Sequence, residues 1–417
     1  MRYIIWMRGE KLAPVLAGLA VLLSACGSST GSTAPSTGST IVLGAAVSLT
    51  GSLSKEGGLT KQGYDLWKDW INSRGGIVVN NVKHPIDIKY EDDQSNANLS
   101  ATLVQKLITD EKANFILGPY GSGATATDAI VAEKNGIPMV EANGAAQAIF
   151  NKGYKFTFGV LSPANKYLTG VLDMAATLSP KPTTIAMLTA NDNFSVEVAK
   201  AVEDYAPSVG MQVVFSKQYP AAAPDLSGLV SQAKAKNPDI VMNSGHLAEA
   251  IAINKAAKTL HLDAKIFAYS VGPSTPDFIS SLGADANYVY DGSQWTPQVK
   301  YQPSFYLSVA DYVKAYKAKF NTTDDPDYHV AESTAACLAF QKAMENAGSL
   351  DPTKVRDALA SLDVLTFFGQ IKFDSRGLNI YKPMVVEQIQ NGTHYTVFPA
   401  SVANGQPQYP TPAWSSR

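Results

Sequence analysis

The chain has 417 residues, 45% of them hydrophobic, which is enough for two or three domains with sizeable cores. The formal net charge is −2, and 17% of the residues are charged. A general nucleic-acid binder would carry a basic excess, so this composition argues against that class of protein. We therefore expect the chain to bind a small molecule or another protein.

Residues 1–26 have the features of an export signal. Basic residues precede an apolar stretch from Leu12 to Leu23, which is shorter than the roughly 20 apolar residues needed to cross a membrane. The stretch ends in "LSAC", which resembles a bacterial lipobox. That resemblance implies that Cys26 becomes the lipid-modified first residue of the mature protein; an uncleaved membrane anchor is the alternative. Residues 27–40, "GSSTGSTAPSTGST", are typical of a flexible tether.

From Ile41 onward, continuous apolar runs alternate with helical patterns. The first series predicts strands at 40–49, 84–93, 113–119 and 137–144, with helices at 60–76, 98–111 and 123–136. The second series predicts strands at 183–192, 211–220, 238–245 and 264–272, with helices at 195–210, 226–237 and 247–262. This βαβα rhythm predicts two similar α/β halves, each with a parallel sheet that helices cover on both faces.

The pattern changes after the second series. Pro303–Phe320 and Val330–Ala347 are long helical stretches. Next, "GQIKFDSRG" and "PMVVEQIQNGTHYTVF" indicate a closing hairpin-like pair. The tail from Ser401, rich in Pro and Gln, is predicted to be loosely held. Cys337, inside "STAACLAF", is predicted to be a small buried apolar residue.

Small polar turns follow several predicted strands, at 48–58, 118–125, 141–146 and 189–195. Because open parallel sheets bind ligands beyond the carboxyl ends of their strands, these turns predict a cleft. One of them, "GPYGSGAT", begins a helix whose first N–H groups, together with Ser122, suit an anion such as a carboxylate. This turn lacks the Gly-Lys-Ser/Thr ending of a nucleotide phosphate loop, and no G-x-G-x-x-G follows the first strand.

The sequence shows no pattern of a catalytic or metal site. The five histidines, at 84, 246, 261, 329 and 394, have neither H-x-x-H nor H-E-x-x-H spacing. No G-x-S-x-G nucleophile elbow follows a predicted strand. We expect no metal, no cofactor and no enzymatic activity.

Four segments resemble, in the right order, the type I solute-binding proteins of ABC transporters. They are "AAVSLTGSLSKEGGLTKQGYDLWKDWINSRGGI", "ILGPYGSGATATDAIVAEKNGIPMVE", "DLSGLVSQAKAKNPDIV" and "FFGQIKFDSRG". The similarity is to the leucine/branched-chain amino acid and amide branch and covers residues 41–398. It implies an α/β fold of two Rossmann-like lobes with parallel sheets, joined by a three-crossover hinge and closing on a ligand.

The resemblance also implies an organisation of the whole chain. We expect a signal peptide at 1–26, a tether at 27–40, lobe 1 at 41–158 and 296–380, lobe 2 at 159–295 and 381–400, and a flexible tail at 401–417. The crossovers are expected near Thr157–Pro163, Tyr290–Pro297 and Asn379–Pro383.

Half of the family's amino acid site is matched well. The family holds the ligand's carboxylate on the first lobe through a serine and backbone groups, and the matching positions here are Gly121, Ser122, Asn143, Gly144, Ala145 and Ala146. The other half departs from the pattern. Phe194 and His246 stand where leucine-type members have tyrosines, and Val271 stands where a glutamate pairs with the α-ammonium.

A buried ammonium without a carboxylate partner is costly. Either another acid replaces the missing glutamate or the ligand has no ammonium. The candidate acids are Glu56, Asp192 and Glu332, of which the first two are expected on loops facing the cleft; ordinary solvated carboxylates are the alternative.

Four aromatic residues, Phe194, Tyr269, Trp295 and Tyr328, are expected at the cleft, where they would pack on a planar or apolar ligand. For Trp295, packing of the hinge is an equal alternative. His246 and His329 are able to donate to a second ligand oxygen, although each is also compatible with a structural role.

These features predict a substrate-binding lipoprotein of an ABC importer. We expect it to capture a small amino acid-like or carboxylate ligand and to deliver it to the permease subunits. The expected protein is a monomer, exported and held by its lipid anchor on the outer side of the cell membrane or in the periplasm, without nucleic acid. An extracellular ligand-sensing domain of similar fold is the alternative, and an enzyme is a third hypothesis that no motif favours.

Overall fold

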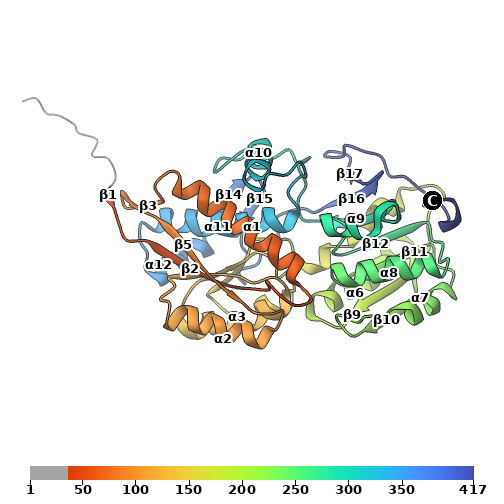
Figure 1. Ribbon diagram of the computed structural model, residues 1–417, viewed down its shortest axis with the longest axis horizontal. Coiled ribbons are helices and arrows are strands. Elements are labelled where there is room, and N and C mark those ends of the chain that lie inside the picture. The colour runs from red at the N-terminus through yellow and green to blue at the C-terminus, as the bar shows by residue number, and fades with distance from the viewer. Residues whose placement is uncertain (1–35) are drawn as a thin grey trace, which may run out of the picture. The chain divides into compact units, whose positions relative to one another are not determined.

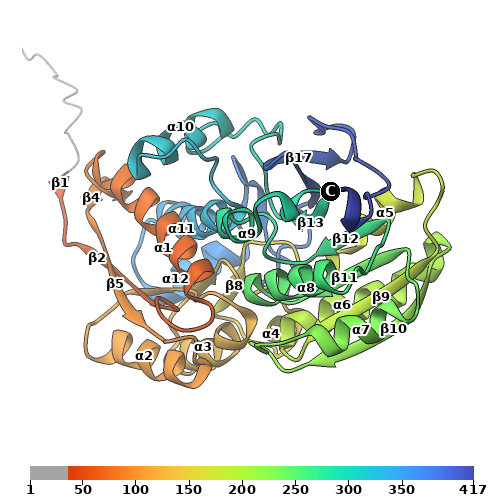
Figure 2. The same cartoon turned by 45° about the vertical axis from the view of Figure 1, so that its right-hand side comes forward.

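The computed structural model describes residues 36–417 (Figures 1 and 2), so the predicted signal peptide, Cys26 and most of the tether lie outside the described residues. Within 36–417, no helix is both long enough and apolar enough to cross a membrane. Two larger sheets organise this part of the chain, one of five strands and one of seven.

The first lobe is built on the five-stranded sheet. Its elements are β2 (Ile41–Val47), α1 (Ser54–Asn72), β5 (Ile86–Asp92), α2 (Ala97–Thr109), β6 (Phe115–Leu117), α3 (Ser122–Asn135), β7 (Met139–Glu141), α4 (Gln147–Phe150), β8 (Thr157–Gly159) and α11 (Tyr328–Ala347). All strands are parallel, in the order β5-β2-β6-β7-β8. Alternate residues of β6 point to opposite faces: Phe115 packs with Phe340 of α11, and Ile116 clusters with Ala129 of α3. Helices α1 and α11 therefore cover one face, and α2 and α3 the other.

The second lobe repeats this arrangement around the seven-stranded sheet. Its elements are α5 (Thr169–Ala176), β9 (Thr184–Ala190), α6 (Asn193–Tyr205), β10 (Gln212–Tyr219), α7 (Ser227–Lys234), β11 (Ile240–Ser244), α8 (Leu247–Thr259), β12 (Ile266–Tyr269), α9 (Pro276–Leu282), β13 (Val289–Ser293), β16 (Val385–Gln390) and β17 (Thr393–Phe398). The strand order is β10-β9-β11-β12-β13-β16-β17, and every pairing is parallel except those of β16 with β13 and with β17. The predicted α/β fold with two parallel sheets covered on both faces is confirmed.

Three further parts of the chain differ from the sequence prediction. Helix α10 (Val309–Phe320) begins one and a half turns later than expected, where Ser308 caps it by accepting from the Asp311 N–H. The predicted hairpin-like pair does not form. Strand β15 (Gly369–Lys372) pairs with β14 (Asp363–Thr366), while β16 and β17 pair with each other in the second sheet. A short sheet, missed in the sequence, joins β1 (Ser36–Thr37), β3 (Ile77–Val79) and β4 (Val82–His84). Helix α12 (Pro352–Ala360) precedes β14.

The segment after Ser401 is held more firmly than its composition predicts. Trp414 is 6% exposed and packs edge-on against Phe267 of β12, with ring centroids 5.7 Å apart. Its indole N–H donates to the carbonyl oxygen of Leu262, and its backbone N–H donates to Asp263. A single buried tryptophan thus fixes a segment that its polar composition suggests is loose.

The chain passes three times between the two sheets, and the three connections are hydrogen-bonded to one another. Asn379 donates to the carbonyl oxygen of Val160. Gln294 accepts from the Ser162 N–H and donates back to the Ser162 carbonyl oxygen. The Ser162 hydroxyl donates to the Lys382 carbonyl oxygen, and the Lys382 ammonium donates to the Gln294 carbonyl oxygen. These contacts make one hydrogen-bonded hinge from segments more than 200 residues apart.

Candidate ligand-binding cleft

The loop between β6 and α3 presents unpaired backbone donors. Gly121 precedes the helix with a φ of 87°, a conformation that favours glycine, and its carbonyl oxygen accepts from the Thr125 N–H. The first N–H groups of α3, beginning at Ser122, have no acceptor within the helix and carry the positive end of its dipole. Helix α3 is 14 residues long, so this end is suited to an anion.

A small cavity lies in front of this helix end, between the two lobes. It is lined by Tyr120, Gly121, Ser122, Asn143, Tyr167, Phe194, His246, Val271, Tyr328, His329 and Glu332. Of the predicted site residues, Gly121, Ser122, Asn143, Phe194 and His246 meet here. Tyr120 and Tyr167 were not identified from the sequence. Tyr120 stands in the predicted glycine turn, so its place in the sequence could have identified it as a candidate site residue.

The wall of the cavity carries a histidine in an electrostatically unusual setting. Burial alone would lower the pKa of His246, but the Asp192 carboxylate, 3.5 Å from its Nε2, raises that pKa to about 9. The Nδ1 atom of His246 is 3.0 Å from the hydroxyl of Tyr120 on the other lobe. At neutral pH the cavity wall therefore holds an imidazolium with its carboxylate partner.

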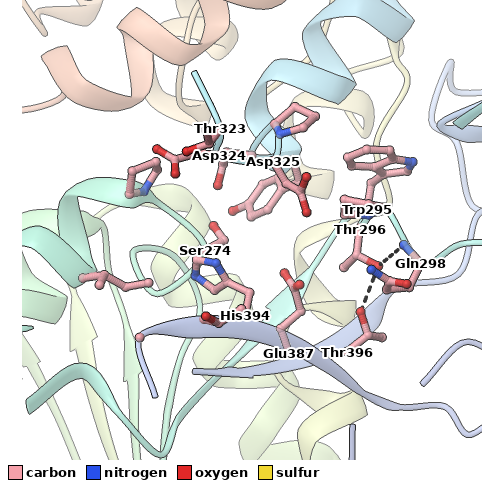
Figure 3. Close-up of a pocket in the computed structure, with 18 of the residues that line it drawn as sticks. Ser274, Trp295, Thr296, Gln298, Thr323, Asp324, Asp325, Glu387, His394 and Thr396 are labelled. Carbon is pink, nitrogen blue, oxygen red and sulfur yellow. Dashed lines mark hydrogen bonds between the residues drawn. The ribbon is translucent and has the colours of Figure 1, made fainter. Parts of the chain in front are cut away.

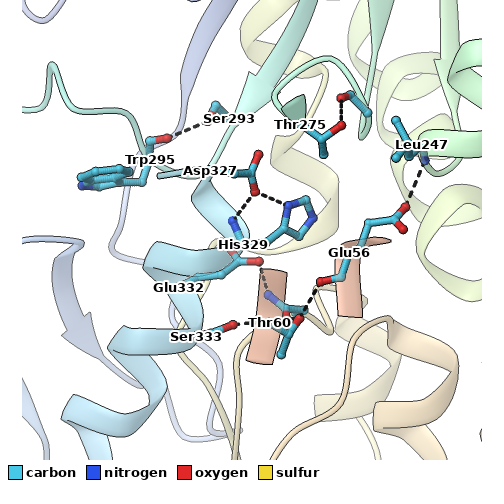
Figure 4. Close-up of polar contacts among 12 residues, drawn as sticks. Glu56, Thr60, Leu247, Thr275, Ser293, Trp295, Asp327, His329, Glu332 and Ser333 are labelled. Carbon is cyan, nitrogen blue, oxygen red and sulfur yellow. Dashed lines mark hydrogen bonds and ion pairs between the residues drawn. The ribbon is translucent and has the colours of Figure 1, made fainter. Parts of the chain in front are cut away.

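Glu332, one of the candidate acids, lines the cavity. One of its carboxyl oxygens accepts from the amide of Asn143, and the other has no hydrogen-bond partner within residues 36–417. Burial raises the pKa of Glu332 well above its ordinary range. Next to it, Asp327 accepts from the backbone N–H of His329 at 2.7 Å (Figure 4). If Glu332 is protonated, its carboxyl group can donate a hydrogen bond to a ligand. If it is ionised, its buried charge needs a cation as partner.

Glu56 is not on the cleft loop where the sequence predicts it, and it does not line this cavity. It lies in the first turn of α1 and not on a loop, and its carboxylate accepts from the Leu247 N–H at the start of α8, at 3.1 Å (Figure 4). Beside it, Gly57 packs closely on the backbone just after β2, where a Cβ would meet the Ser48 carbonyl oxygen at 2.0 Å. Asp192 caps α6 by accepting from the Ser195 N–H.

The predicted positions after Asn143 stand behind the cavity, outside its lining. The Gly144 N–H donates to Glu141, and the Ala146 N–H donates to the Ser122 hydroxyl at 3.1 Å. Ala145 is 1% exposed. These hydrogen bonds hold the loop in place and orient Ser122.

Tyr269 and Trp295 also lie away from this cavity. The Tyr269 hydroxyl donates to Asn254 of α8 at 3.1 Å, because the last residue of β12 points to the covering helix. The Trp295 indole donates to the Phe367 carbonyl oxygen at 2.9 Å, and its ring packs edge-on against Tyr312. The hinge-packing alternative for Trp295 fits this geometry.

Within residues 36–417, no three histidine, cysteine or carboxylate side chains are grouped so that they could hold a metal ion. Cys337 is buried and unpaired, as predicted. The cavity therefore presents helix N–H groups, hydroxyls, an imidazolium and one buried carboxyl group, which suit binding of a small polar molecule.

Comparison with known proteins gives the family. Residues 40–393 match the family model described as periplasmic binding protein. A curated relative, the Leu/Ile/Val-binding protein homolog 7 of Brucella abortus, is 23% identical over 386 residues, which cover 89% of this chain and 94% of the relative.

Two solved structures share the fold. The branched-chain amino acid transporter substrate-binding protein LivJ of Streptococcus pneumoniae, in complex with isoleucine, aligns with a TM-score of 0.76 at 22% identity, covering 85% of this chain and 97% of LivJ. An ABC transporter solute-binding protein of R. palustris, in complex with benzoate, aligns with a TM-score of 0.71 at 16% identity, covering 90% and 97%.

The family and these structures comprise solute-binding proteins and not enzymes, in agreement with the sequence prediction. Membership of this family implies an exported protein. The family match over 40–393, the doubly repeated α/β fold and the cavity between the lobes agree. This chain belongs to the periplasmic binding protein family, and it is similar to members of the branched-chain amino acid branch.

Proposed function

We propose that this protein is the substrate-binding component of an ABC importer, which captures a small carboxylate ligand between its lobes and delivers it to permease subunits. One observation carries the proposal: the free N-terminus of α3 and the Ser122 hydroxyl face a cavity lined by both lobes. The imidazolium of His246 adds a positive charge to the same cavity.

The chemistry of the ligand follows from these donors. Isoleucine in LivJ and benzoate in the R. palustris protein differ in every group except the carboxylate. That shared group is the one that the α3 terminus suits. Val271 contributes no charge, whereas Glu332 is available to an ammonium group, so the ligand is either a simple carboxylate or an amino acid paired with Glu332.

Ligand entry requires the lobes to separate. The cavity measures about 10 Å³, roughly the room that one water molecule occupies. Contacts between the lobes, including Glu56 to Leu247 and Tyr120 to His246, close it. A ligand that contacts both lobes would favour the closed arrangement.

The experiment is a thermal-shift screen of residues 41–417, followed by calorimetry on Ser122→Ala. The screen should contain matched pairs, such as leucine with 4-methylpentanoate and phenylalanine with 3-phenylpropanoate, so that the ammonium is tested separately. Ser122→Ala is expected to weaken binding of the best carboxylate by about 1–3 kcal/mol, because a buried hydrogen-bonding group is lost.

The control for this test is Ser231→Ala, which removes an exposed hydroxyl on α7 and should leave affinity unchanged. Unfolding curves of both variants are needed, because Ser122 also accepts from Ala146. Unchanged affinity in a folded Ser122→Ala protein would contradict the proposed site. Turnover of any compound in the screen, detected by mass spectrometry, would contradict a binding function without catalysis.

A further inference from the structure

A second and much larger pocket (Figure 3) shares Tyr328 with the lining of the Ser122 cavity. It measures about 650 Å³ and is lined by residues of three regions: 274–280 and 387–396 of the second lobe, the connection at 295–298, and 317–328 of the first lobe. We call it the acidic pocket, because its lining includes Asp277, Asp324, Asp325, Asp327 and Glu387. A volume of this size is typical of small-molecule sites.

One buried carboxylate of the acidic pocket, that of Glu387, has no cationic partner within residues 36–417. Glu387 is 7% exposed, and its carboxylate is directed from β16 into the pocket (Figure 3). Within residues 36–417, none of the ion pairs includes Glu387. Two rim carboxylates, by contrast, are neutralised: Asp277 by Lys55 at 2.7 Å and Asp325 by Lys317 at 2.8 Å. Glu387 differs from these two carboxylates in being buried without a cation.

The sheet places a second buried acid directly opposite Glu387. Asp291 of β13 is its partner across the antiparallel pair, and Asp291 is 1% exposed. Like charges opposite each other destabilise a sheet. Burial, followed by the interaction with Asp291, raises the pKa of Glu387 well above its ordinary range. Two ionised carboxylates at these positions would repel each other, so the pair needs a proton or a bound cation to neutralise it.

Other acceptors in the acidic pocket are also unused. Asp327 is 6% exposed, and its second carboxyl oxygen has no hydrogen-bond partner within residues 36–417. The same holds for the hydroxyl of Ser274, which is 8% exposed. An ammonium group offers three N–H donors, which these acceptors and Glu387 can receive. The side chains of Trp295 and Tyr328 also line the acidic pocket, beside the space that the carbon body of such a ligand would take.

We propose that the acidic pocket is a second binding site, separate from the Ser122 cavity, that takes a primary organic ammonium ion. The pocket is far larger than a metal ion requires, and within residues 36–417 no side chains form a metal-holding group. The ligand's ammonium pairs with the carboxylate of Glu387, and its carbon body lies beside Trp295 and Tyr328.

The test uses phenethylammonium as the probe and 2-phenylethanol as its neutral counterpart, titrated calorimetrically at physiological ionic strength into residues 41–417. Wild-type protein is expected to bind the amine saturably and at least tenfold more tightly than the alcohol. Glu387→Gln should weaken the amine at least tenfold, while Glu203→Gln, an exposed position on α6, should bind it like wild type. Ser274→Ala removes a buried hydroxyl that lines the pocket, and it should weaken the amine several-fold.

Three results would overturn the proposal. The first is equal affinity of wild type and folded Glu387→Gln for the amine, and the second is equal binding of amine and alcohol. The third is displacement of the amine by Ca²⁺, which would assign the pocket to a metal. Ser122→Ala should leave amine binding unchanged, so failure of the cleft proposal would not affect this result; loss of amine binding in that variant would place the amine in the cleft instead.

Discussion

At the scale of single residues, the hinge contains a lysine in an unusual position. Lys382 is 4% exposed, and its ammonium donates to the carbonyl oxygen of Gln294 and lies 4.2 Å from the ring centroid of Phe368. Burial lowers the pKa of Lys382 from 10.5 to about 7, although the negative charge of Glu332 acts in the opposite direction. The hinge therefore contains an amine that titrates close to neutral pH.

Lys382→Met is expected to change how stability depends on pH. Between about pH 7 and 10.5, the unfolded chain binds a proton at Lys382 that the folded protein does not bind, so this group makes the free energy of unfolding rise with pH. The contribution is at most about 1.4 kcal/mol per pH unit. Urea unfolding at pH 7, 8 and 9 should show that this rise is absent from Lys382→Met.

The comparison with wild type is essential, because His246, with its raised pKa of about 9, contributes stability that is lost as pH rises through 9. Lys236→Met is the control, since Lys236 is exposed on the surface. Parallel stability curves for wild type and Lys382→Met between pH 7 and 9 would show that Lys382 is charged in the folded protein.

At the scale of elements, two helix N-termini face the region between the lobes, and they are used differently. The N-terminus of α3 faces the Ser122 cavity. The N-terminus of α8 is already occupied, because its first N–H, at Leu247, donates to Glu56 of α1. A buried carboxylate at the positive end of a helix is stabilising. Glu56 thus connects the lobes in the arrangement that encloses the cavity.

Glu56→Gln is expected to weaken this connection between the lobes. The amide keeps an acceptor but loses the charge, which is worth about 0.5–2 kcal/mol at a helix N-terminus. The variant should have a larger radius of gyration by small-angle scattering without ligand and a lower affinity for every carboxylate that wild type binds. The loss of affinity in this variant should be the same for leucine and for 4-methylpentanoate.

Glu133→Gln is a matched control for Glu56→Gln. Glu133 also accepts from backbone N–H groups, those of Lys155 and Phe156, but within the first lobe, so its loss should lower stability without changing the radius of gyration. If Glu56→Gln impaired leucine binding alone, Glu56 would be the partner of the ligand's ammonium and the connecting role would be wrong.

At the scale of the whole molecule, both binding proposals involve surfaces from two lobes that three chain crossings join. The Ser122 cavity and the acidic pocket share Tyr328, which opens α11. On the first lobe, Asp327 lines the acidic pocket and accepts from His329, which lines the cavity. A change in the distance between the lobes would alter both sites together.

The proposed attachment to a membrane also belongs to this scale. Cys26→Ser should leave an unlipidated protein in the soluble fraction of cells, because lipidation requires the thiol. Cys337→Ala is the control: this cysteine is buried in α11, and its variant should stay with the membranes. Acyl chains found by mass spectrometry on Cys26→Ser would contradict the lipobox prediction.

The sequence by itself determined the features that depend on local pattern. Apolar runs and helical periods place four parallel strands in each sheet and the helices between them, because burial on two faces leaves a signal along the chain. The positive φ of Gly121 and the helix start at Ser122 follow from a glycine turn after a strand, which can be identified without knowing the fold.

Only the tertiary structure decided which side chains meet. Tyr269 lies in a strand as the sequence predicts, yet its side chain points to α8, since the pattern of a buried strand does not reveal which face a residue occupies. Glu56 meets Leu247, and Asp291 meets Glu387, across separations of 191 and about 96 residues. The acidic pocket depends on such pairings of distant segments, which no local pattern specifies, and so it could be found only in the folded chain.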